Sequence, residues 1–322
     1  PKANQYAPAF SLPEEKRKRI CEDALKIAKA VNYRNAGTVE FLLDKYGNHY
    51  FIEVNPRIQV EHTVSEMVTG IDIVQSQILI AQGYPLNSKE IGIYSQDDIQ
   101  VRGYAIQCRV TTEDPLHNFA PDAGIIDTYR TGSGFGIRID GSSRFTGAHI
   151  SHYYDSLLVK VISWSRTFED AAKKAVRALK EIKVRGVKTN IPFLINVLNH
   201  EEFLSGKCNT GFITYNPGLF DIRVKEDIEL KILNFIGEKV VNETKGNKPD
   251  FDLPRVPKVV RPDKQYGTKQ ILDEKGPGGL VEWIKNKKSL LITDTTMRDA
   301  HQSLMATRMR TIDMLRIAKA VS

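Results

Sequence analysis

Residues 53–61 read Glu-Val-Asn-Pro-Arg-Ile-Gln-Val-Glu, so polar side chains alternate with apolar ones along this stretch. In an extended backbone successive side chains point to opposite faces, so the polar ones should share one side. That row would contain Glu53, Asn55, Arg57, Gln59 and Glu61. Carboxylates, amides and a guanidinium are the groups needed to hold a metal ion together with an oxyanion. An amphipathic edge strand with a charged, solvated face is the alternative, and the pattern alone leaves both open.

The two runs before this stretch are typical of strands joined by a tight turn. Residues 38–43 and 49–53 are rich in β-branched and aromatic residues, and a turn-forming segment separates them. A hairpin would place Glu40 beside Glu53. These carboxylates and the Asn55 carbonyl are hard oxygen ligands, which Mg²⁺ or Mn²⁺ bridging nucleotide phosphates requires.

Pro56 should end the regular pairing of the second strand near Asn55, because proline has no backbone N–H to donate. Beyond it we expect the chain to continue extended but unpaired. Arg57, Gln59 and Glu61 would then project from the edge of the scaffold, where a substrate could reach them.

These segments resemble the catalytic strand pair of biotin carboxylases, which are ATP-grasp enzymes. The resemblance rests on residues 37–42 and 51–62. Further matching motifs follow in the same order at residues 102–110, 112–115, 134–138, 153–156 and 186–190. Several colinear motifs argue against a chance match.

A second resemblance lies near the C-terminus. Residues 290–293 are a short apolar run, predicted to be a strand, and residues 294–303 read Asp-Thr-Thr-Met-Arg-Asp-Ala-His-Gln-Ser. This stretch is similar to the first strand and loop of the carboxyltransferase barrel of the pyruvate carboxylase family. Acetyl-CoA and propionyl-CoA carboxylases lack that fusion, so the resemblance implies an internal part of a bacterial-type pyruvate carboxylase.

The fold class predicted from these resemblances is α+β. An ATP-grasp and biotin carboxylase C-terminal half, with an antiparallel sheet and helices, would be followed by a linker and the first βα unit of a TIM barrel. The expected domains are 1–95, the later part of the ATP-grasp domain; 96–222, the biotin carboxylase C-terminal subdomain; 223–288, a linker or adaptor and candidate allosteric region; and 289–322, the start of the carboxyltransferase (β/α)8 barrel.

Local patterns predict the helices and one turn. Apolar periodicity predicts a helix over residues 64–81, and residues 311–322 are interpreted as a barrel helix. Thr167 is expected to cap a helix that ends at Gly186. The glycine-rich residues 131–136 are interpreted as a hairpin turn.

The resemblance implies that the first half-reaction cleaves ATP to activate bicarbonate. Glu40, Glu53 and Asn55 would hold the divalent ions that neutralise the β- and γ-phosphates. Lys2 is matched to a lysine of the family that contacts bicarbonate, although residues 3–6 depart from the family pattern.

The same resemblance assigns bicarbonate to the segment after the hairpin. Arg57, Gln59 and the Val60 backbone would orient it, which converts an encounter into a positioned attack. Glu61 would be the general base, because bicarbonate must lose its proton as it attacks the γ-phosphorus. Arg138 would bind biotin and stabilise negative charge on its ureido oxygen.

For the second half-reaction the resemblance points to residues 298–302. Asp299 resembles one ligand of the carboxyltransferase metal, and Arg298 and Gln302 resemble groups that bind the carboxylate and carbonyl of pyruvate. Arginine suits a carboxylate because its planar fork can pair bidentately.

The implied cofactors are ATP with Mg²⁺ or Mn²⁺, biotin on a carrier domain outside this chain, and a second divalent metal, Zn²⁺ or Mn²⁺, in the carboxyltransferase site. The implied partners are ATP, bicarbonate, the biotin carrier domain, pyruvate and acetyl-CoA as a candidate effector. We also expect a homotetramer.

Bulk properties exclude other classes of protein. The net charge is +7, which could indicate nucleic-acid binding. The sequence contains no stripe of Lys and Arg interleaved with aromatic residues, so we expect no nucleic-acid partner. No apolar run approaches the length that a bilayer helix needs, so we expect no membrane role. The three isolated cysteines fit a reducing cytoplasm. Pro1 is not an initiator Met, and we expect the chain to begin inside a longer polypeptide.

Two alternatives remain open. A stand-alone biotin carboxylase subunit of an acyl-CoA carboxylase is disfavoured by residues 293–303. The second is an inactive, truncated assembly or regulatory module. The motifs do not support it, because the metal carboxylates and Glu61 are all present.

Overall fold

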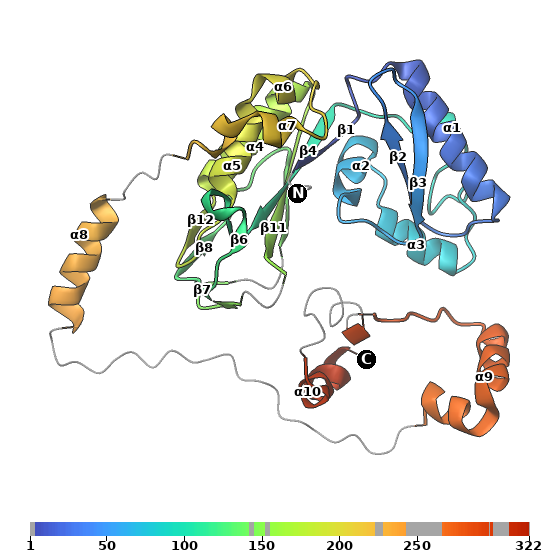
Figure 1. Cartoon of the computed structure of the whole chain (residues 1–322). Helices are drawn as coiled ribbons and strands as arrows, with labels where there is room; N and C mark the ends of the chain where they lie inside the picture. The colour runs from blue at the N-terminus through green and yellow to red at the C-terminus, as the bar shows by residue number, and fades with distance from the viewer. Residues whose placement is uncertain are drawn as a thin grey trace. The chain divides into compact units, whose positions relative to one another are not determined.

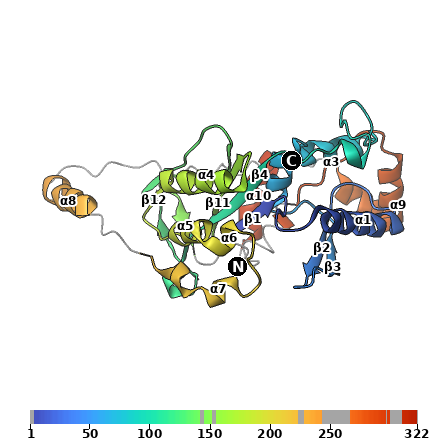
Figure 2. The ribbon, with the colours of Figure 1, turned by 90° about the horizontal axis from the view of Figure 1, so that it is seen from above.

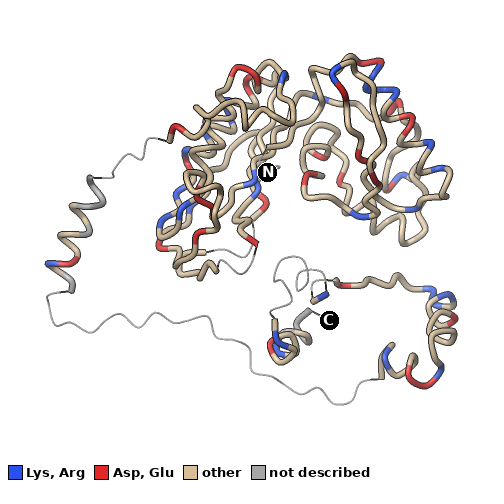
Figure 3. The backbone as a smooth tube through the Cα atoms, in the orientation of Figure 1, with Lys and Arg blue, Asp and Glu red and all other residues tan. Residues whose placement is uncertain are grey.

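The computed structural model describes residues 4–141, 145–151, 155–222, 228–242, 266–295, 297–298 and 309–321. The chain divides into two compact units, Pro1–Asp221 and Ile222–Ser322. Among the described helices, none combines the length and apolar character needed to cross a bilayer. Figure 3 shows basic and acidic residues interspersed along the first unit, so the excess of positive charge is not gathered in one segment there.

A four-stranded antiparallel sheet in the order β1-β4-β11-β9 forms the centre of the first unit (Figure 1). Its strands are β1 (Asn4–Ala7), β4 (Tyr104–Thr111), β11 (Leu157–Ser165) and β9 (Ile137–Gly141). The two central strands, β4 and β11, are largely apolar, as expected of strands buried on both faces.

Helices cover both faces of this sheet. On one face, the Thr63 hydroxyl of α2 (His62–Thr69) donates to the Gln107 side chain of β4. On the other, the Ser163 hydroxyl of β11 donates to a carbonyl of α4 (Phe168–Glu181), which lies along β11 (Figure 2). Because Gln107 is in register with Ile162, its face carries the odd residues of β4 and the even residues of β11.

Shorter elements complete the first unit. The helical ones are α5 (Ile191–Asn199), α6 (Glu201–Leu204), α7 (Phe212–Tyr215), η1 (Gln96–Asp98), η2 (Pro115–His117) and η3 (Pro217–Phe220). The paired strands are β5 (Glu113–Asp114) with β6 (Ala120–Pro121), β7 (Gly124–Ile125) with β10 (His149–Ile150), and β8 (Thr128–Arg130) with β12 (Lys183–Arg185).

The predicted hairpin is confirmed. Strands β2 (Thr38–Leu43) and β3 (His49–Asn55) pair antiparallel, and the pairing ends at Asn55 as Pro56 requires. Helices α1 (Glu14–Ala30) and α3 (Ile73–Ala81) belong to the same N-terminal part of the unit.

The single helix predicted over residues 64–81 is wrong. Gly70 ends α2 with φ of 73°, a left-handed conformation that glycine adopts without steric cost. The Asp72 side chain then accepts a hydrogen bond from the N–H of Gln75 and starts α3. Apolar periodicity continues across both helices and hides this corner.

Two further sequence expectations fail around α4. Thr167 caps the helix as predicted, but the helix ends at Glu181 because residues 183–185 pair with β8 as β12. Residues 131–136 do not join a hairpin, since β8 pairs with β12 whereas β9 pairs with β11. Local turn chemistry does not reveal which sheet a strand joins.

The second unit contains helices α8 (Ile228–Gly237), α9 (Thr268–Asn286) and α10 (Thr311–Val321), and a π-helical turn, η4 (Glu238–Asn242). The helix predicted near residue 311 is therefore confirmed. The strand predicted at residues 290–293 is wrong, because these residues form no regular element. A barrel strand is stabilised by neighbours on both sides, and the described residues of this unit contain no strand.

Packing of α2 on the sheet makes a first prediction. Val68 is 3% exposed in a cluster with Val64, Ala105 and Ile162, whereas Val74 on α3 is 46% exposed. We expect Val68→Ala to lower the free energy of unfolding by about 2 kcal/mol through lost burial and a cavity. The control Val74→Ala should change it by less than about 0.5 kcal/mol. Urea unfolding measures both, and equal losses would contradict the packing described.

Candidate functional site

An acid pair on the hairpin is the first part of the site. Glu40 of β2 lies directly opposite Glu53 of β3, and a bulge follows Glu40. The Asn55 side-chain amide donates to Glu40 at 3.1 Å and to Glu53 at 2.9 Å. The structure thus brings together the three residues to which the sequence assigns a metal.

The chemistry of these donors fits Mg²⁺ or Mn²⁺. Two carboxylates supply hard oxygen ligands, and half a turn of the Asn55 amide would present its carbonyl oxygen in place of the nitrogen. Ions of this kind commonly use one or two carboxylates and complete their shell with water and phosphate oxygens. Among the residues described, no group of three or more His, Cys, Asp or Glu side chains could hold a metal.

The segment after Asn55 is not extended to Glu61, which corrects the sequence expectation. The Arg57 N–H donates to the Asn55 carbonyl at 2.8 Å, and residues 60–61 form a turn that leads into α2. Gln59 nevertheless stays with the acid pair, because its amide donates to Glu40 at 3.4 Å. Arg57 in turn donates to the Gln59 side-chain oxygen at 3.3 Å.

Glu61 leaves this row. It is the residue before α2, and its carboxylate accepts a hydrogen bond from Arg109 of β4 at 3.0 Å. The sequence places Glu61 beside Arg57, but the turn at residues 60–61 directs it towards the central sheet instead. The neighbouring His62 ring lies 2.7 Å from the Gln59 carbonyl, as expected of a hydrogen-bonding histidine.

Arg109 belongs to a row of charges that crosses three strands of the sheet. Lys160 of β11 is in register with Arg109 on one side and with Asp140 of β9 on the other. The Lys160 ammonium lies 3.1 Å from the Asp140 carboxylate and donates to the Val60 carbonyl at 3.3 Å. The segment that carries Val60 is therefore attached directly to the sheet.

Arg138 lies on the same face of the sheet, two residues before Asp140 on β9. Its Nε and Nη2 donate to the two oxygens of Asp140 at 2.8 and 3.2 Å, and its Nη1 donates to Glu66 of α2 at 2.6 Å. Arg138 also lines a pocket of about 460 Å³ at the corner between α2 and α3. The Arg138 guanidinium is thus fixed by two carboxylates at the edge of this pocket.

Mutual contacts shift the pKa values of this pair. Burial alone would raise the pKa of Asp140, but hydrogen bonds from Arg138 and Lys160 outweigh burial and hold it below its ordinary value of 3.8. Burial alone would lower the pKa of Arg138, and the hydrogen bonds to Asp140 and Glu66 raise it above its usual range. Both groups are therefore charged at neutral pH.

Sequence reasoning assigned no role to four members of this network: Glu66, Arg109, Asp140 and Lys160. Arg109 stands in one of the matched motifs, and Lys160 is a charged residue inside the otherwise apolar run of β11. A lysine in the middle of a buried strand is a signal that could have been followed, because it must find a partner.

Three predicted site residues, Lys2, Asp299 and Gln302, lie outside the residues that the structure describes. Arg298 is described in the second unit, where its side chain is exposed and its backbone N–H donates to the Thr295 carbonyl at 3.0 Å.

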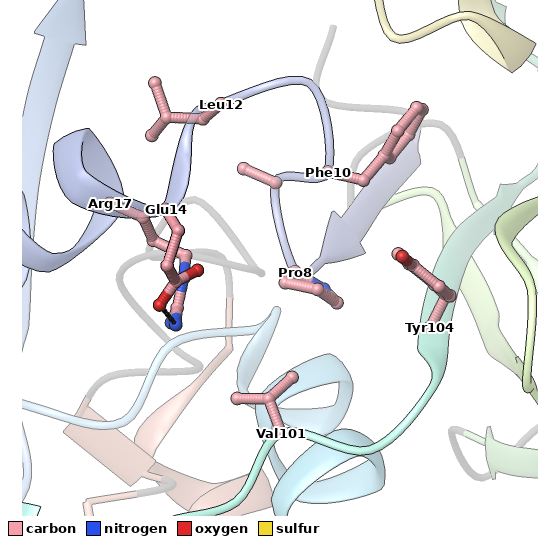
Figure 4. Close-up of a pocket in the computed structure, with 8 residues that line it drawn as sticks. Pro8, Phe10, Leu12, Glu14, Arg17, Val101 and Tyr104 are labelled. Atoms are coloured by element: carbon pink, nitrogen blue, oxygen red, sulfur yellow. Dashed lines mark hydrogen bonds and ion pairs between the residues drawn. The ribbon is translucent and has the colours of Figure 1, made fainter. Parts of the chain in front are cut away.

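A separate pocket of about 310 Å³ lies between the start of α1 and β4 (Figure 4). Phe10, Val101 and Tyr104 form part of its wall, and Glu14 and Arg17 are paired at one side of it. None of the predicted site residues that the structure describes lines this pocket.

Comparison with known domain families identifies two matches. Residues 2–89 match the ATP-binding domain of the carbamoyl-phosphate synthase L chain, and residues 107–215 match the biotin carboxylase C-terminal domain.

Comparison with individual proteins extends the similarity over the whole chain. Pyruvate carboxylase of Bacillus subtilis is 56% identical over 322 residues, which is 98% of this chain and 28% of that protein. The chain therefore spans just over a quarter of that relative's length.

Solved structures give the same result. Rhizobium etli pyruvate carboxylase T882A with its allosteric activator acetyl coenzyme A matches 100% of this chain and 33% of that one, with 48% identity and a TM-score of 0.71. The biotin carboxylase domain of Hydrogenobacter thermophilus 2-oxoglutarate carboxylase, bound to MgADP, ADP and bicarbonate, matches 68% of this chain and 47% of that one, with 44% identity and a TM-score of 0.64.

The pKa of Asp140 predicts a pH dependence of stability. Because its folded-state value is lowered, the ionised carboxylate stabilises the fold above the ordinary value of 3.8, and this contribution is lost as pH falls through the folded-state value. We expect Asp140→Asn to be less stable than the unsubstituted chain at about pH 7, with a difference that shrinks as the pH falls below about 4.

Thermal unfolding across this pH range measures the effect. The exposed Asp97→Asn provides a matched control that should stay close to the unsubstituted chain. A stability difference for Asp140→Asn that is the same at every pH would contradict the ionic role of Asp140.

Proposed function

Because this chain belongs to the pyruvate carboxylase family, we propose that it contributes to the ATP- and bicarbonate-dependent carboxylation of biotin, from which the carboxyl group passes to pyruvate to give oxaloacetate. The observation that carries this proposal is the grouping of Glu40, Glu53 and Asn55 with Gln59 and Arg57 at the end of the hairpin. Oxygens suited to a metal ion thus lie close to the groups proposed for bicarbonate, which supports the proposal.

Glu40, Glu53 and Asn55 would hold the divalent ion. When bound, Mg²⁺ or Mn²⁺ neutralises charge on the β- and γ-phosphates of ATP. The hairpin contributes rigidity, because the two carboxylates stand opposite each other on paired strands. They are therefore held in place before any ligand arrives.

Bicarbonate would be oriented by Arg57, Gln59 and the Val60 backbone. Lys160 holds the Val60 carbonyl at 3.3 Å and so fixes the peptide between Val60 and Glu61. As a bicarbonate oxygen attacks the γ-phosphorus, ADP leaves and the bicarbonate proton passes to Glu61. Arg109 holds the Glu61 carboxylate in position for that transfer.

Arg138 would stabilise negative charge on the biotin ureido oxygen when the ring nitrogen loses its proton. The pocket at the corner between α2 and α3 gives that guanidinium access to a ligand. Biotin would arrive on a carrier domain of the same polypeptide, outside this chain.

The second half-reaction would use residues near the C-terminus. Asp299 would bind the carboxyltransferase metal, Zn²⁺ or Mn²⁺, while Arg298 and Gln302 would bind the carboxylate and carbonyl of pyruvate. The proposal for these residues rests on the motif at residues 294–303 and on relatives that match the whole chain.

The domain assignments remain part of the proposal. Residues 1–95 and 96–222 would form the later part of a biotin carboxylase, 223–288 a linker with a regulatory role, and 289–322 the start of a barrel. The Rhizobium etli relative is described with acetyl coenzyme A as allosteric activator, which supports the same effector here. A homotetramer in the cytoplasm completes the proposal.

The runner-up, a biotin carboxylase subunit of an acyl-CoA carboxylase, is less well supported. The solved biotin carboxylase domain matches 68% of this chain, whereas pyruvate carboxylases match 98–100%. An inactive assembly or regulatory module is a second alternative, and measurement of ATP cleavage distinguishes it from an enzyme.

The general-base assignment is tested by Glu61→Gln in the polypeptide that carries this chain. We expect bicarbonate-dependent ATP cleavage to fall by about 100-fold or more, because glutamine cannot accept the proton. Carboxyl exchange on the pyruvate side should persist. The control Glu169→Gln changes an exposed glutamate of α4 and should cleave ATP normally. An ATPase rate close to wild type would remove Glu61 from the mechanism.

The pyruvate assignment is tested by Arg298→Ala in the same polypeptide. We expect oxaloacetate formation to fall by roughly 10- to 100-fold more than ATP cleavage, because a charge-assisted hydrogen bond to pyruvate is lost. Arg310→Ala, in an exposed ion pair with Asp313, is the matched control. Unchanged oxaloacetate formation by Arg298→Ala would refute the role.

A further inference from the structure

Glu66 is a nearly buried acid to which no role has yet been given. Its side chain is 10% exposed, and both carboxylate oxygens have partners, with Oε2 also lying 3.7 Å from Nε2 of His62. Oε2 accepts from Nη1 of Arg138 at 2.6 Å, and Oε1 accepts from the backbone N–H of Ile73 at 2.9 Å. Because burial of a polar group is costly without partners, these contacts are what allow Glu66 to occupy this position.

Glu66 is itself held in a fixed position. It lies on α2, which packs on the sheet through the buried Val64 and Val68. Its second oxygen is bound at the start of α3, directly after the left-handed Gly70 turns the chain. A carboxylate fixed at two elements cannot follow a mobile arginine, so it must restrain Arg138.

Two carboxylates from different elements grip Arg138. Asp140 lies on the same strand and takes Nε and Nη2, while Glu66 approaches from α2 and takes Nη1. A guanidinium has five N–H donors, so three are engaged and two have no partner among the described residues. One of these two lies on each terminal nitrogen, and Arg138 lines the adjacent pocket.

We propose that Glu66 is a positioning residue that orients Arg138 so that its two remaining N–H groups meet the biotin ureido oxygen. This inference rests on the proposed function, because it presumes that Arg138 acts on biotin. Asp140 alone binds only one edge of the guanidinium. The rest of the Arg138 side chain could then still rotate about this edge. Glu66 removes this freedom and so prepares the donors before the ligand binds.

The test uses the full polypeptide with free biotin as acceptor and measures biotin-dependent ATP cleavage relative to biotin-independent ATP cleavage. A partly unfolded preparation lowers both rates equally, so the ratio reports the site alone. We expect Glu66→Gln to lower this ratio by roughly 10- to 100-fold, the effect of a misplaced reacting group. Glu66→Asp keeps the charge but shortens the side chain, and should give a smaller loss.

A double-variant cycle tests whether Glu66 acts through Arg138. If it does, Glu66→Gln should produce almost no further loss in an Arg138→Gln background. A loss of the same size in both backgrounds would overturn the positioning role. Glu169→Gln, the same change in an exposed ion pair with Lys173, serves as control and should leave the ratio unaltered.

The possible outcomes distinguish failure of the Glu66 role from failure of the proposed biotin role of Arg138. A normal ratio for Glu66→Gln beside an impaired Arg138→Gln would overturn the positioning role alone. A normal ratio for Arg138→Gln would overturn both the biotin assignment and the role of Glu66. Equal loss of both ATPase rates in Glu66→Gln and in Glu66→Asp would show a merely structural residue and would also overturn the inference.

Discussion

The packing of α2 against one face of the central sheet is the constraint on which the site depends. Val64 and Val68 of α2 pack against Ala105 and Ile162 of the sheet. Because this contact fixes the position of α2, it also fixes the position of the segment that precedes the helix. The segment runs from the end of β3 to the start of α2. Only a few residues therefore separate the acid pair on the hairpin from the helix that packs on the sheet. The hydrophobic contact therefore sets the distance between groups that have no apolar character themselves.

Charge balance explains why this face can carry so many ionic groups close to the core. Arg109, Lys160 and Arg138 are cations, and each pairs with an acid: Glu61, Asp140 or Glu66. Burial of a lone charge is costly, and removal of one partner leaves the other uncompensated. The network is therefore expected to hold together as a unit.

The sequence was sufficient for features that depend on neighbours along the chain. Alternation and a turn predicted the β2–β3 hairpin, Pro56 predicted where its pairing ends, and Thr167 predicted the start of α4. Features that depend on distant partners were missed. No residue close to Glu61 in the sequence indicates that Arg109, on a strand far along the chain, will be its partner. Among the described residues of the second unit, no strand pairs with residues 290–293.

Two of the missed residues, Asp140 and Lys160, also connect the groups proposed for biotin and for bicarbonate. Asp140 is shared by Arg138 and Lys160, and Lys160 holds the Val60 carbonyl, so a continuous path runs from the arginine assigned to biotin to the segment assigned to bicarbonate. Residues on adjacent strands in register cannot move independently without breaking the ladder. A sheet face therefore suits a reaction in which one bound group must meet another, because it fixes both against the same backbone.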